Sequence, residues 1–362
     1  MGKRARIGAT ALLVCLLGAA SPQPNLGISV FPADNPWNWD ISGFAVHPNS
    51  TNIINAISSS APIREDYSFY YSVVDNTQAN VDVGFTLYED ESDPGPIFGS
   101  PVNGTVTYGY RGRYPIPSGA QIEGGSDAHV LVINKDSHLL YETYQTSGPP
   151  WFASCGAVYD LNSNNVRPDG WTSADAAGLP IFPGLIRYDE VFTAGAINHA
   201  LRFTCQNTQN THIYPARHDA GSSNANYPPM GTRVRLKASK DITGYTGEAL
   251  VVLTALKKYG LLLADNGSNW YISTTDDSRW GGTNITGIRN MHGSDFEVVT
   301  SVDGSGNPIQ AVTNGGTAAP LPAGPGGPPI TPGGTPGAGG CGLTGMEAVL
   351  LLALLRPRRS RP

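Results

Sequence analysis

Both ends of this 362-residue chain have the composition of targeting segments, which leaves only the middle to form a compact fold. Residues 1–20 begin with a basic stretch, continue with the apolar run Ile7 to Leu17 and end in Gly18-Ala19-Ala20. This is the layout of a secretory signal peptide. Residues 315–340 are almost entirely Gly, Pro, Thr and Ala, which predicts a flexible linker. We therefore expect one globular domain over 21–314.

Residues 341–362 contain Cys341, an apolar run between Leu343 and Leu355, and an arginine-rich end. This layout resembles the Cys-containing C-terminal sorting tails of bacterial envelope proteins. The resemblance implies that Cys341 has a sorting role, that a sorting protease or transpeptidase is a partner, and that the tail holds the protein in the membrane before processing. The apolar run is shorter than the roughly 20 residues that span a bilayer. The predicted location is the cell surface or the extracellular space.

The charge of the middle segment argues against nucleic acid as a partner. The whole chain has 23 basic and 29 acidic residues. Without the three basic residues of the signal peptide, and without the four arginines and Glu347 of the tail, 16 basic and 28 acidic residues remain, a net charge of about −12. A surface this acidic repels nucleic acid and anionic lipid.

The residue pattern of the domain predicts a mainly β fold. Gly, Pro and Tyr are abundant and charged residues make up only 14%, a balance that favours a turn-rich extracellular protein. We predict an antiparallel β-sandwich or barrel-like core with a few short helices. The expected strands include 67–74, 81–88, 129–134 and 139–144, and the expected helices are 172–177 and 247–260.

Cys155 and Cys205 are the two cysteines outside the targeting segments. In an oxidising compartment such a pair is usually bridged, and closing this loop would stabilise the fold by a few kcal/mol. We therefore predict a disulfide between them. Their spacing fits no zinc motif.

Acidic residues and a histidine give the first candidates for catalysis. Asp127 and His129 are two residues apart at the start of a predicted strand, so their side chains should share a face. A carboxylate that orients an imidazole is a general acid–base pair. Further candidate catalytic acids are Asp175, Glu190 and Asp265.

Residues 160–175 form a polar loop that suits ligand binding. The loop begins like a calcium site, but Asn165 replaces the expected glycine and Trp171 stands where a bidentate glutamate belongs. Calcium is thus kept only as an alternative to having no cofactor, and no metal ligands are assigned. Arg167 and Trp171 from this loop are candidate substrate-binding residues.

A second set of candidate binding residues is cationic or aromatic. Strand alternation places Arg233, Arg235 and Lys237 on one face, where they either pair with local carboxylates or line a groove for an anionic sugar. Arg187 and Trp270 complete the predicted binding set.

The core, roughly 28–300, resembles a family of secreted bacterial proteins without an established activity, on the stretch from Asp160-Leu-Asn-Ser-Asn to Arg187-Tyr-Asp-Glu. That resemblance transfers no catalytic residues. Motifs of lipases, nucleotide enzymes and zinc proteases are absent from the sequence.

Two functions remain open. One is a surface-displayed carbohydrate-active enzyme, either a glycosidase that uses two of the acids or a polysaccharide lyase in which Arg233, Arg235 and His129 act on a uronate. The other is a non-catalytic protein, which binds glycans or adheres at the surface, or is purely structural. Extracellular polysaccharide is the expected partner of the enzyme and of the glycan-binding protein.

Overall fold

The computed structural model describes residues 26–94, 111–281, 285, 287–303, 307–309 and 311–313. The predicted signal peptide, the linker and the tail with Cys341 lie outside the described residues.

Strands dominate the described part of the chain. The strands are β1 (Arg64–Phe69), β2 (Tyr71–Val74), β3 (Val81–Phe85), β4 (Arg111–Tyr114), β5 (Val130–Asn134), β6 (Leu139–Tyr144), β7 (Trp151–Ala153), β8 (Cys155–Asp160), β9 (Leu201–Cys205), β10 (Arg233–Leu236), β11 (Leu261–Asn266), β12 (Tyr271–Thr275) and β13 (Phe296–Val299). The α-helices are α1 (Ser50–Ile57) and α2 (Gly247–Lys258), and η4 (Asp189–Ala194) is a π-helix. Short 3₁₀ turns are η1 (Pro36–Asn38), η2 (Glu89–Glu91), η3 (Phe182–Gly184), η5 (Ser278–Trp280), η6 (Ile288–Asn290) and η7 (Gly293–Asp295).

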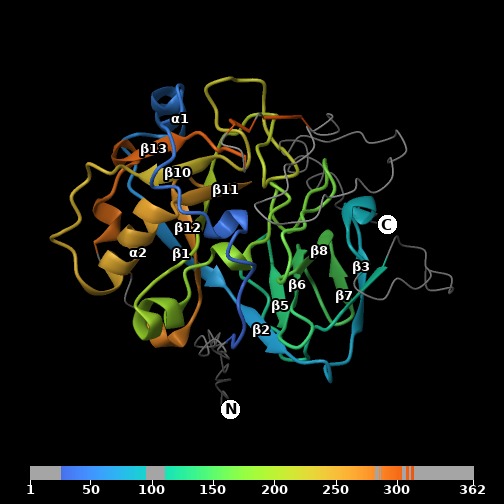
Figure 1. Ribbon diagram of the computed structural model, residues 1–362. Helices are drawn as coiled ribbons and strands as arrows, with labels where there is room; N and C mark the ends of the chain where they lie inside the picture. The colour runs from blue at the N-terminus through green and yellow to red at the C-terminus, as the bar shows by residue number, and fades with distance from the viewer. Residues whose placement is uncertain are drawn as a thin grey trace, which may run out of the picture.

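The strands form three sheets (Figure 1). The largest has the order β1-β12-β9-β11-β10-β13, a second has the order β2-β5-β6-β8, and the smallest has the order β4-β3-β7. The prediction of a β-rich core with a few short helices is confirmed. The sheets are mixed rather than purely antiparallel, because each contains at least one parallel pair, such as β9 with β11, β2 with β5 and β3 with β7.

The chain passes from the six-stranded sheet to the four-stranded sheet between two consecutive strands, β1 and β2. The sequence predicts one strand over 67–74, but β1 ends at Phe69 and belongs to the six-stranded sheet, whereas β2 begins at Tyr71 and belongs to the four-stranded sheet. The register of β1 against β12 shifts between Tyr67 and Phe69, so Ser68 is an extra residue. Such a bulge bends the strand and lets it leave one sheet for the next.

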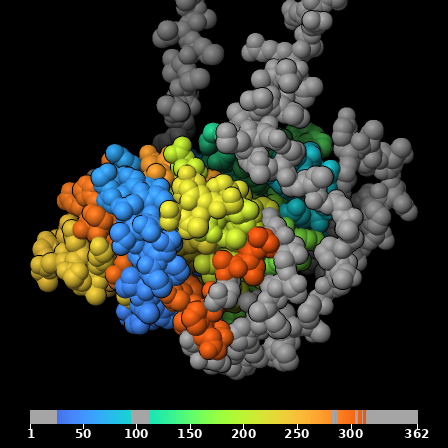
Figure 2. All heavy atoms as spheres, turned by 90° about the horizontal axis from the view of Figure 1, so that it is seen from above, coloured from blue at the N-terminus to red at the C-terminus, as the bar shows by residue number. Residues whose placement is uncertain are grey.

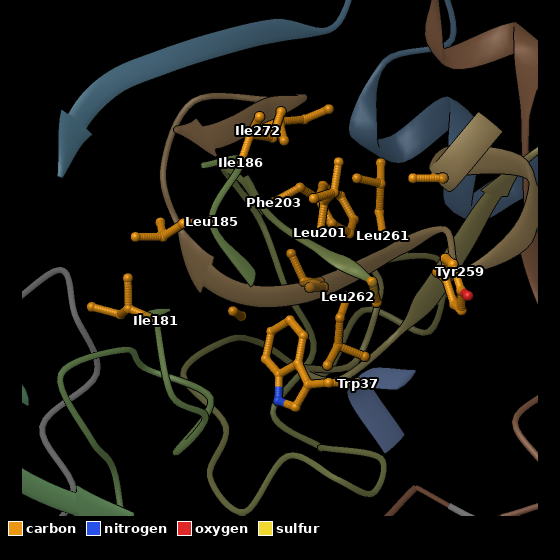
Figure 3. Close-up of a cluster of buried hydrophobic side chains, with 14 of the residues drawn as sticks. Trp37, Ile181, Leu185, Ile186, Leu201, Phe203, Tyr259, Leu261, Leu262 and Ile272 are labelled. Atoms are coloured by element: carbon orange, nitrogen blue, oxygen red, sulfur yellow. The ribbon is translucent and has the colours of Figure 1, made fainter. Parts of the chain in front are cut away.

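The main core lies around the central strands of the six-stranded sheet. Figure 3 shows Leu201 and Phe203 of β9 beside Leu261 and Leu262 of β11, with Trp37 packed near them. These four residues are fully buried, as expected for neighbouring parallel strands that are covered on both faces. A smaller cluster, which includes Val83, Phe85, Tyr114 and Tyr141, forms a second core around the other two sheets.

The two α-helices pack on the six-stranded sheet through apolar residues at helical spacing. Helix α1 buries Ile53, Ile54 and Ile57 and contacts β13, and α2, which confirms the helix expected over 247–260, contacts β10. The helix expected over 172–177 is wrong. The Ser173 hydroxyl donates to the Asp175 carbonyl oxygen at 2.8 Å, a local bond that competes with helix formation.

The segment that contains α1 lies on the upper face of the molecule, which Figure 2 shows from above. In that view the blue segment that contains α1 lies beside the yellow segment near residue 225, and the Asn49 side-chain amide donates to the Ala225 carbonyl oxygen at 3.1 Å. None of the helices in the described part of the chain has the length and hydropathy needed to cross a membrane.

The predicted disulfide is wrong, because Cys155 and Cys205 are both free. Cys155 begins β8 in the four-stranded sheet, whereas Cys205 ends β9 inside the six-stranded sheet. The Cys205 thiol donates instead to the Asn207 carbonyl oxygen at 3.3 Å. Burial raises the pKa of Cys155 to about 11 and that of Cys205 to about 12.

We expect the purified protein, unfolded in denaturant without reductant, to be alkylated at both Cys155 and Cys205. In the folded protein the same thiols should react slowly, because both are buried and their raised pKa values leave little thiolate at neutral pH. Peptide mass spectrometry after iodoacetamide treatment measures both states. Protection of the two cysteines that persists in denaturant and disappears with reductant would contradict the free-thiol structure.

Candidate active site

A buried ion pair between Arg202 and Asp175 lies where the sheets meet. Arg202 is on β9, and its Nε and Nη2 atoms donate to the two carboxylate oxygens of Asp175 at 2.7 and 2.5 Å. Its Nη1 donates to the Ser273 hydroxyl of β12 at 2.5 Å, and the guanidinium lies 5.3 Å from the centre of the Phe69 ring. The two charged side chains are 5% and 0% exposed. The pair is therefore bidentate and almost fully removed from water.

Asp265 lies next to this pair on β11. Its Oδ2 is 3.5 Å from Nη2 of Arg202, and its Oδ1 accepts from the backbone N–H groups of Ala176 at 3.3 Å and Asn266 at 2.8 Å. The register of β11 against β9 shifts between Leu263 and Asp265, so a bulge sets the direction of this side chain. Burial and then the charge of Asp175 raise the pKa of Asp265 to about 7, while the side chain is 20% exposed. Such a carboxyl can donate a proton near neutral pH.

His129 and Glu123 form a second buried pair beside the first. Nδ1 of His129 bonds to the Glu123 carboxylate, and Nε2 lies 3.0 Å from the Ala174 carbonyl oxygen. The Ser68 hydroxyl donates to the other Glu123 oxygen at 2.6 Å. Because both ring nitrogens face acceptors, this environment favours the imidazolium. Burial alone lowers the pKa of His129, but the bond and charge of Glu123 outweigh burial and raise it.

The expectation that Asp127 orients His129 is wrong. The side chain of Asp127 is exposed, and its Oδ1 accepts from the Ser126 hydroxyl at 3.2 Å. Ala128 between them has φ 46°, which is far from extended backbone and breaks the strand alternation. Strand β5 begins only at Val130.

Two further acids near these pairs have raised pKa values. Burial and then the charge of Glu123 raise the pKa of Asp66 on β1. Burial raises the pKa of Glu142 on β6 to about 8, although the carboxylate accepts backbone N–H groups of Ile181 and Phe182. Acids with pKa values shifted toward neutrality are a common property of functional sites.

The outer part of this cluster contains tyrosine and strained backbone. The Tyr144 ring lies 5.7 Å from the His129 ring, and burial and then the charges of Asp127 and Asp265 raise the pKa of Tyr144. Ala128 and Gln145 both have positive φ, 46° and 51°. Their segments pair through the Gln145 N–H to Asp127 carbonyl bond of 2.7 Å and the Thr146 N–H to Ala128 carbonyl bond of 3.0 Å. Backbone strain of this kind is often found at functional sites.

Thus the structure brings together three of the predicted catalytic residues, His129, Asp175 and Asp265, and leaves Asp127 at the exposed edge of the cluster.

Glu190 is part of a separate group, in which it pairs with Arg187 at 2.5 Å and His199 at 3.0 Å. Burial raises the pKa of Glu190, but the charges of Arg187 and His199 outweigh that effect and lower it. Arg187 is therefore engaged in an internal ion pair rather than in the cluster around Arg202.

The three cations predicted on one strand face, Arg233, Arg235 and Lys237, do not face the cluster around Arg202. Arg233 is fully buried, donates from Nη2 to the Pro36 carbonyl oxygen at 2.7 Å, and lies over the Trp39 ring at 5.1 Å. Arg235 pairs with Glu297 at 2.9 Å, and Lys237 donates to the Ser294 carbonyl oxygen at 2.8 Å. Pairing with a local carboxylate is therefore found for Arg235, whereas Arg233 and Lys237 donate to backbone carbonyl oxygens.

Of the remaining predicted binding residues, Trp270 and Arg167 are buried, whereas Trp171 is partly exposed. Trp270 is fully buried between Phe203 and Phe296, at ring distances of 5.7 and 5.2 Å, so it has no free face for a sugar. Arg167 is buried, pairs with Asp93 and donates to the Thr172 carbonyl oxygen at 2.8 Å. Trp171 lies 5.5 Å from the Arg167 guanidinium and is partly exposed, so its ring is accessible to a ligand.

The sequence analysis missed Arg202, Glu123, Asp66 and Glu142 as members of the site. Arg202 and Glu142 each carry the only formal charge in an otherwise apolar, aromatic or hydroxyl-bearing strand, β9 and β6. An unpaired buried charge is very costly. One charged residue in such a strand therefore predicts, from sequence alone, a buried ion pair or a functional site.

No group of three or more possible metal ligands is found among the described residues. In the loop considered for calcium, Asp160 is exposed and its Oδ1 accepts from the Asn162 N–H at 2.9 Å, a local turn.

No protein-family model, no curated protein and no solved structure matches the chain. The site therefore has to be interpreted from its own geometry.

We expect Asp175→Asn to destabilise the protein by about 3–5 kcal/mol, because the buried guanidinium of Arg202 loses its counter-charge. Urea unfolding followed by tryptophan fluorescence measures the change. The matched control is Asp127→Asn, an exposed aspartate of the same cluster, which should change stability by less than about 0.5 kcal/mol. Equal losses in the two variants would contradict the central role of the Arg202–Asp175 pair.

Asp265 also predicts a specific pH dependence of stability. In an unfolded chain an aspartate ionises near pH 4, at about 3.9, whereas folded Asp265 ionises near 7. Between these values the folded state binds more protons, so the free energy of unfolding falls as pH rises. This contribution is complete below about pH 4 and is lost as pH rises through about 7.

We expect Asp265→Asn to remove the part of the pH-dependent decrease in the free energy of unfolding that Asp265 causes. Urea unfolding at several pH values between about 4 and 8 compares the variant with the unchanged protein. A variant whose stability declines as steeply as that of the unchanged protein would show that Asp265 does not have a raised pKa.

Proposed function

We propose that this protein is an exported, surface-displayed glycoside hydrolase that acts on extracellular polysaccharide. The predicted signal peptide and sorting tail would deliver it to the cell surface, and a sorting protease or transpeptidase would process the tail. The observation that carries the proposal is that one turn, Ala174 to Ala176, bonds to both parts of the site. Its Ala174 carbonyl oxygen lies 3.0 Å from Nε2 of His129, two residues after the exposed Asp127, and its Ala176 N–H donates to the Asp265 carboxyl at 3.3 Å.

Asp265 suits the role of general acid. Its pKa of about 7 keeps a large part of the carboxyl protonated near neutral pH, and its partial exposure leaves it open to a substrate. In hydrolysis it would protonate the glycosidic oxygen as the bond to the sugar carbon breaks. Arg202 and the two N–H groups on Oδ1 would then stabilise the carboxylate that forms.

Asp127 suits the role of the second carboxylate. The side chain is exposed and, within the described residues, the hydrogen bond that it accepts comes from the Ser126 hydroxyl at 3.2 Å, so it can take a proton from water or attack the sugar. Its backbone is held by the strained pairing with Gln145. The His129–Glu123 pair behind it acts as a positioning group, since both of its members are buried.

Among the two carbohydrate reactions, the geometry favours hydrolysis over elimination. A lyase needs a cation beside the uronate, and the three candidate cations Arg233, Arg235 and Lys237 face other parts of the chain. Arg202 is bound to Asp175 and Ser273 through all three of its side-chain nitrogens.

The test is a screen of the full chain against neutral and acidic polysaccharides, reading both released reducing ends and the ultraviolet absorbance of unsaturated uronates. We expect reducing ends without that absorbance, and a rate that falls above about pH 7 as Asp265 loses its proton. Asp265→Asn should lower the rate by about 10²–10⁴-fold, whereas Asp160→Asn, an exposed aspartate of a local turn, should leave it unchanged.

Two other results would reject the hydrolase. Unsaturated products would make the protein a lyase. No product from any polysaccharide, together with retained binding on a glycan array, would leave the non-catalytic glycan-binding surface protein as the function.

A further inference from the structure

An open groove of about 730 Å³ runs along β2 and the turn that follows it. Its other walls are Pro117, Gly119 and Gln121, and Lys135, which directly follows β5. Ligand sites commonly have volumes of about 300–1,000 Å³. The groove therefore has room for several sugar units.

One end of the groove lies beside the acid cluster, the group of carboxyl residues Asp66, Glu123, Glu142, Asp175 and Asp265 around Arg202 and His129. Tyr70, the residue between β1 and β2, lines the groove and donates its hydroxyl to Asp276. It comes two residues after Ser68, whose hydroxyl donates to Glu123 at 2.6 Å. Gln121 lines the groove only two residues before Glu123. A chain lying in the groove would thus have one end next to Glu123 and His129.

The groove walls are polar but carry almost no net charge. The lining contains hydroxyl and amide side chains, among them Thr77, Gln78 and Gln121, with one acid and one base, Asp75 and Lys135. The Asp75 carboxylate is occupied locally, because its Oδ1 accepts from the Thr77 N–H at 2.9 Å and the Thr77 hydroxyl at 2.5 Å.

Amide side chains both donate and accept hydrogen bonds, as sugar hydroxyl groups require, and a tyrosine ring offers an apolar face with a polar edge. Nothing in this lining would compensate the repeated negative charges of a polyuronate or a sulfated glycan. A neutral glycan is the extended polymer whose chemistry fits such walls.

We propose that this groove binds an uncharged polysaccharide chain and delivers one end of it to the acid cluster. The proposal deepens the proposed hydrolase function and rests on it for the reaction, but the binding itself is testable without turnover.

The experiment measures binding by isothermal titration calorimetry on the full chain carrying Asp265→Asn. The ligands are neutral hexasaccharides of the gluco-, xylo-, manno- and N-acetylglucosamine types and one hexauronate. We expect binding of at least one neutral ligand, with an affinity insensitive to salt, and no binding of the hexauronate.

Groove variants locate the binding site. Gln121→Ala should weaken binding about fivefold, the effect of one lost hydrogen-bonding group, and Tyr70→Ala about five- to tenfold, with Tyr70→Phe restoring most of the loss. The matched control is Gln206→Ala, because Gln206 is an exposed glutamine outside the groove. It should bind like the unchanged chain.

The outcomes separate this proposal from the proposed reaction. Binding that the groove variants weaken, without any turnover by the unchanged protein, would keep the groove and reject the hydrolase. Turnover or binding that Gln121→Ala and Tyr70→Ala leave unchanged would reject the groove. Preference for the hexauronate, or no binding of any ligand, would also reject the proposal.

Discussion

The pairing of Arg202 with Asp175 is the constraint on which the rest of the site depends. A guanidinium in the middle of a six-stranded sheet, with Leu201 and Phe203 fully buried beside it, would be prohibitively costly without a counter-charge. The turn that carries Asp175 must therefore dock on the sheet. The same turn presents the Ala174 carbonyl oxygen to His129 and the Ala176 N–H to Asp265, so one ion pair positions the groups of both sheets.

Charge balance explains why three acids of this cluster, Asp66, Glu142 and Asp265, have raised pKa values. Five carboxyl groups, of Asp66, Glu123, Glu142, Asp175 and Asp265, share two cationic partners, Arg202 and His129. Glu123 and Asp175 take the direct bonds to those cations. For Asp66, Glu142 and Asp265, burial and like charges outweigh the favourable contacts that remain, such as the 3.5 Å contact between Asp265 and Arg202, and favour the neutral forms. Natural proteins commonly give up stability in this way where a site requires it.

Local sequence patterns predict the elements here, and long-range contacts decide the site. The hairpin of β5 and β6 and the helix α2 follow from apolar periodicity and end signals, so both are found as expected. The burial of Trp270 and the passage of the chain from β1 to β2 depend on residues far away in sequence. The partner of His129 is close in sequence, but Glu123 and His129 pair across a segment with irregular backbone at Gly125 (φ 97°) and Ala128 (φ 46°), which a strand pattern does not predict.

Several departures from regular structure lie at the candidate site. Ser68 and the residue before Asp265 are extra residues in their strands, and the positive φ angles of Ala128 and Gln145 face each other across two backbone hydrogen bonds. A fold can keep such costly features only where the surrounding packing holds them in place. Each of them sets the direction of a polar side chain or of the backbone next to one. Irregular backbone of this kind, rather than a short motif, gives the polar side chains of the candidate site their directions.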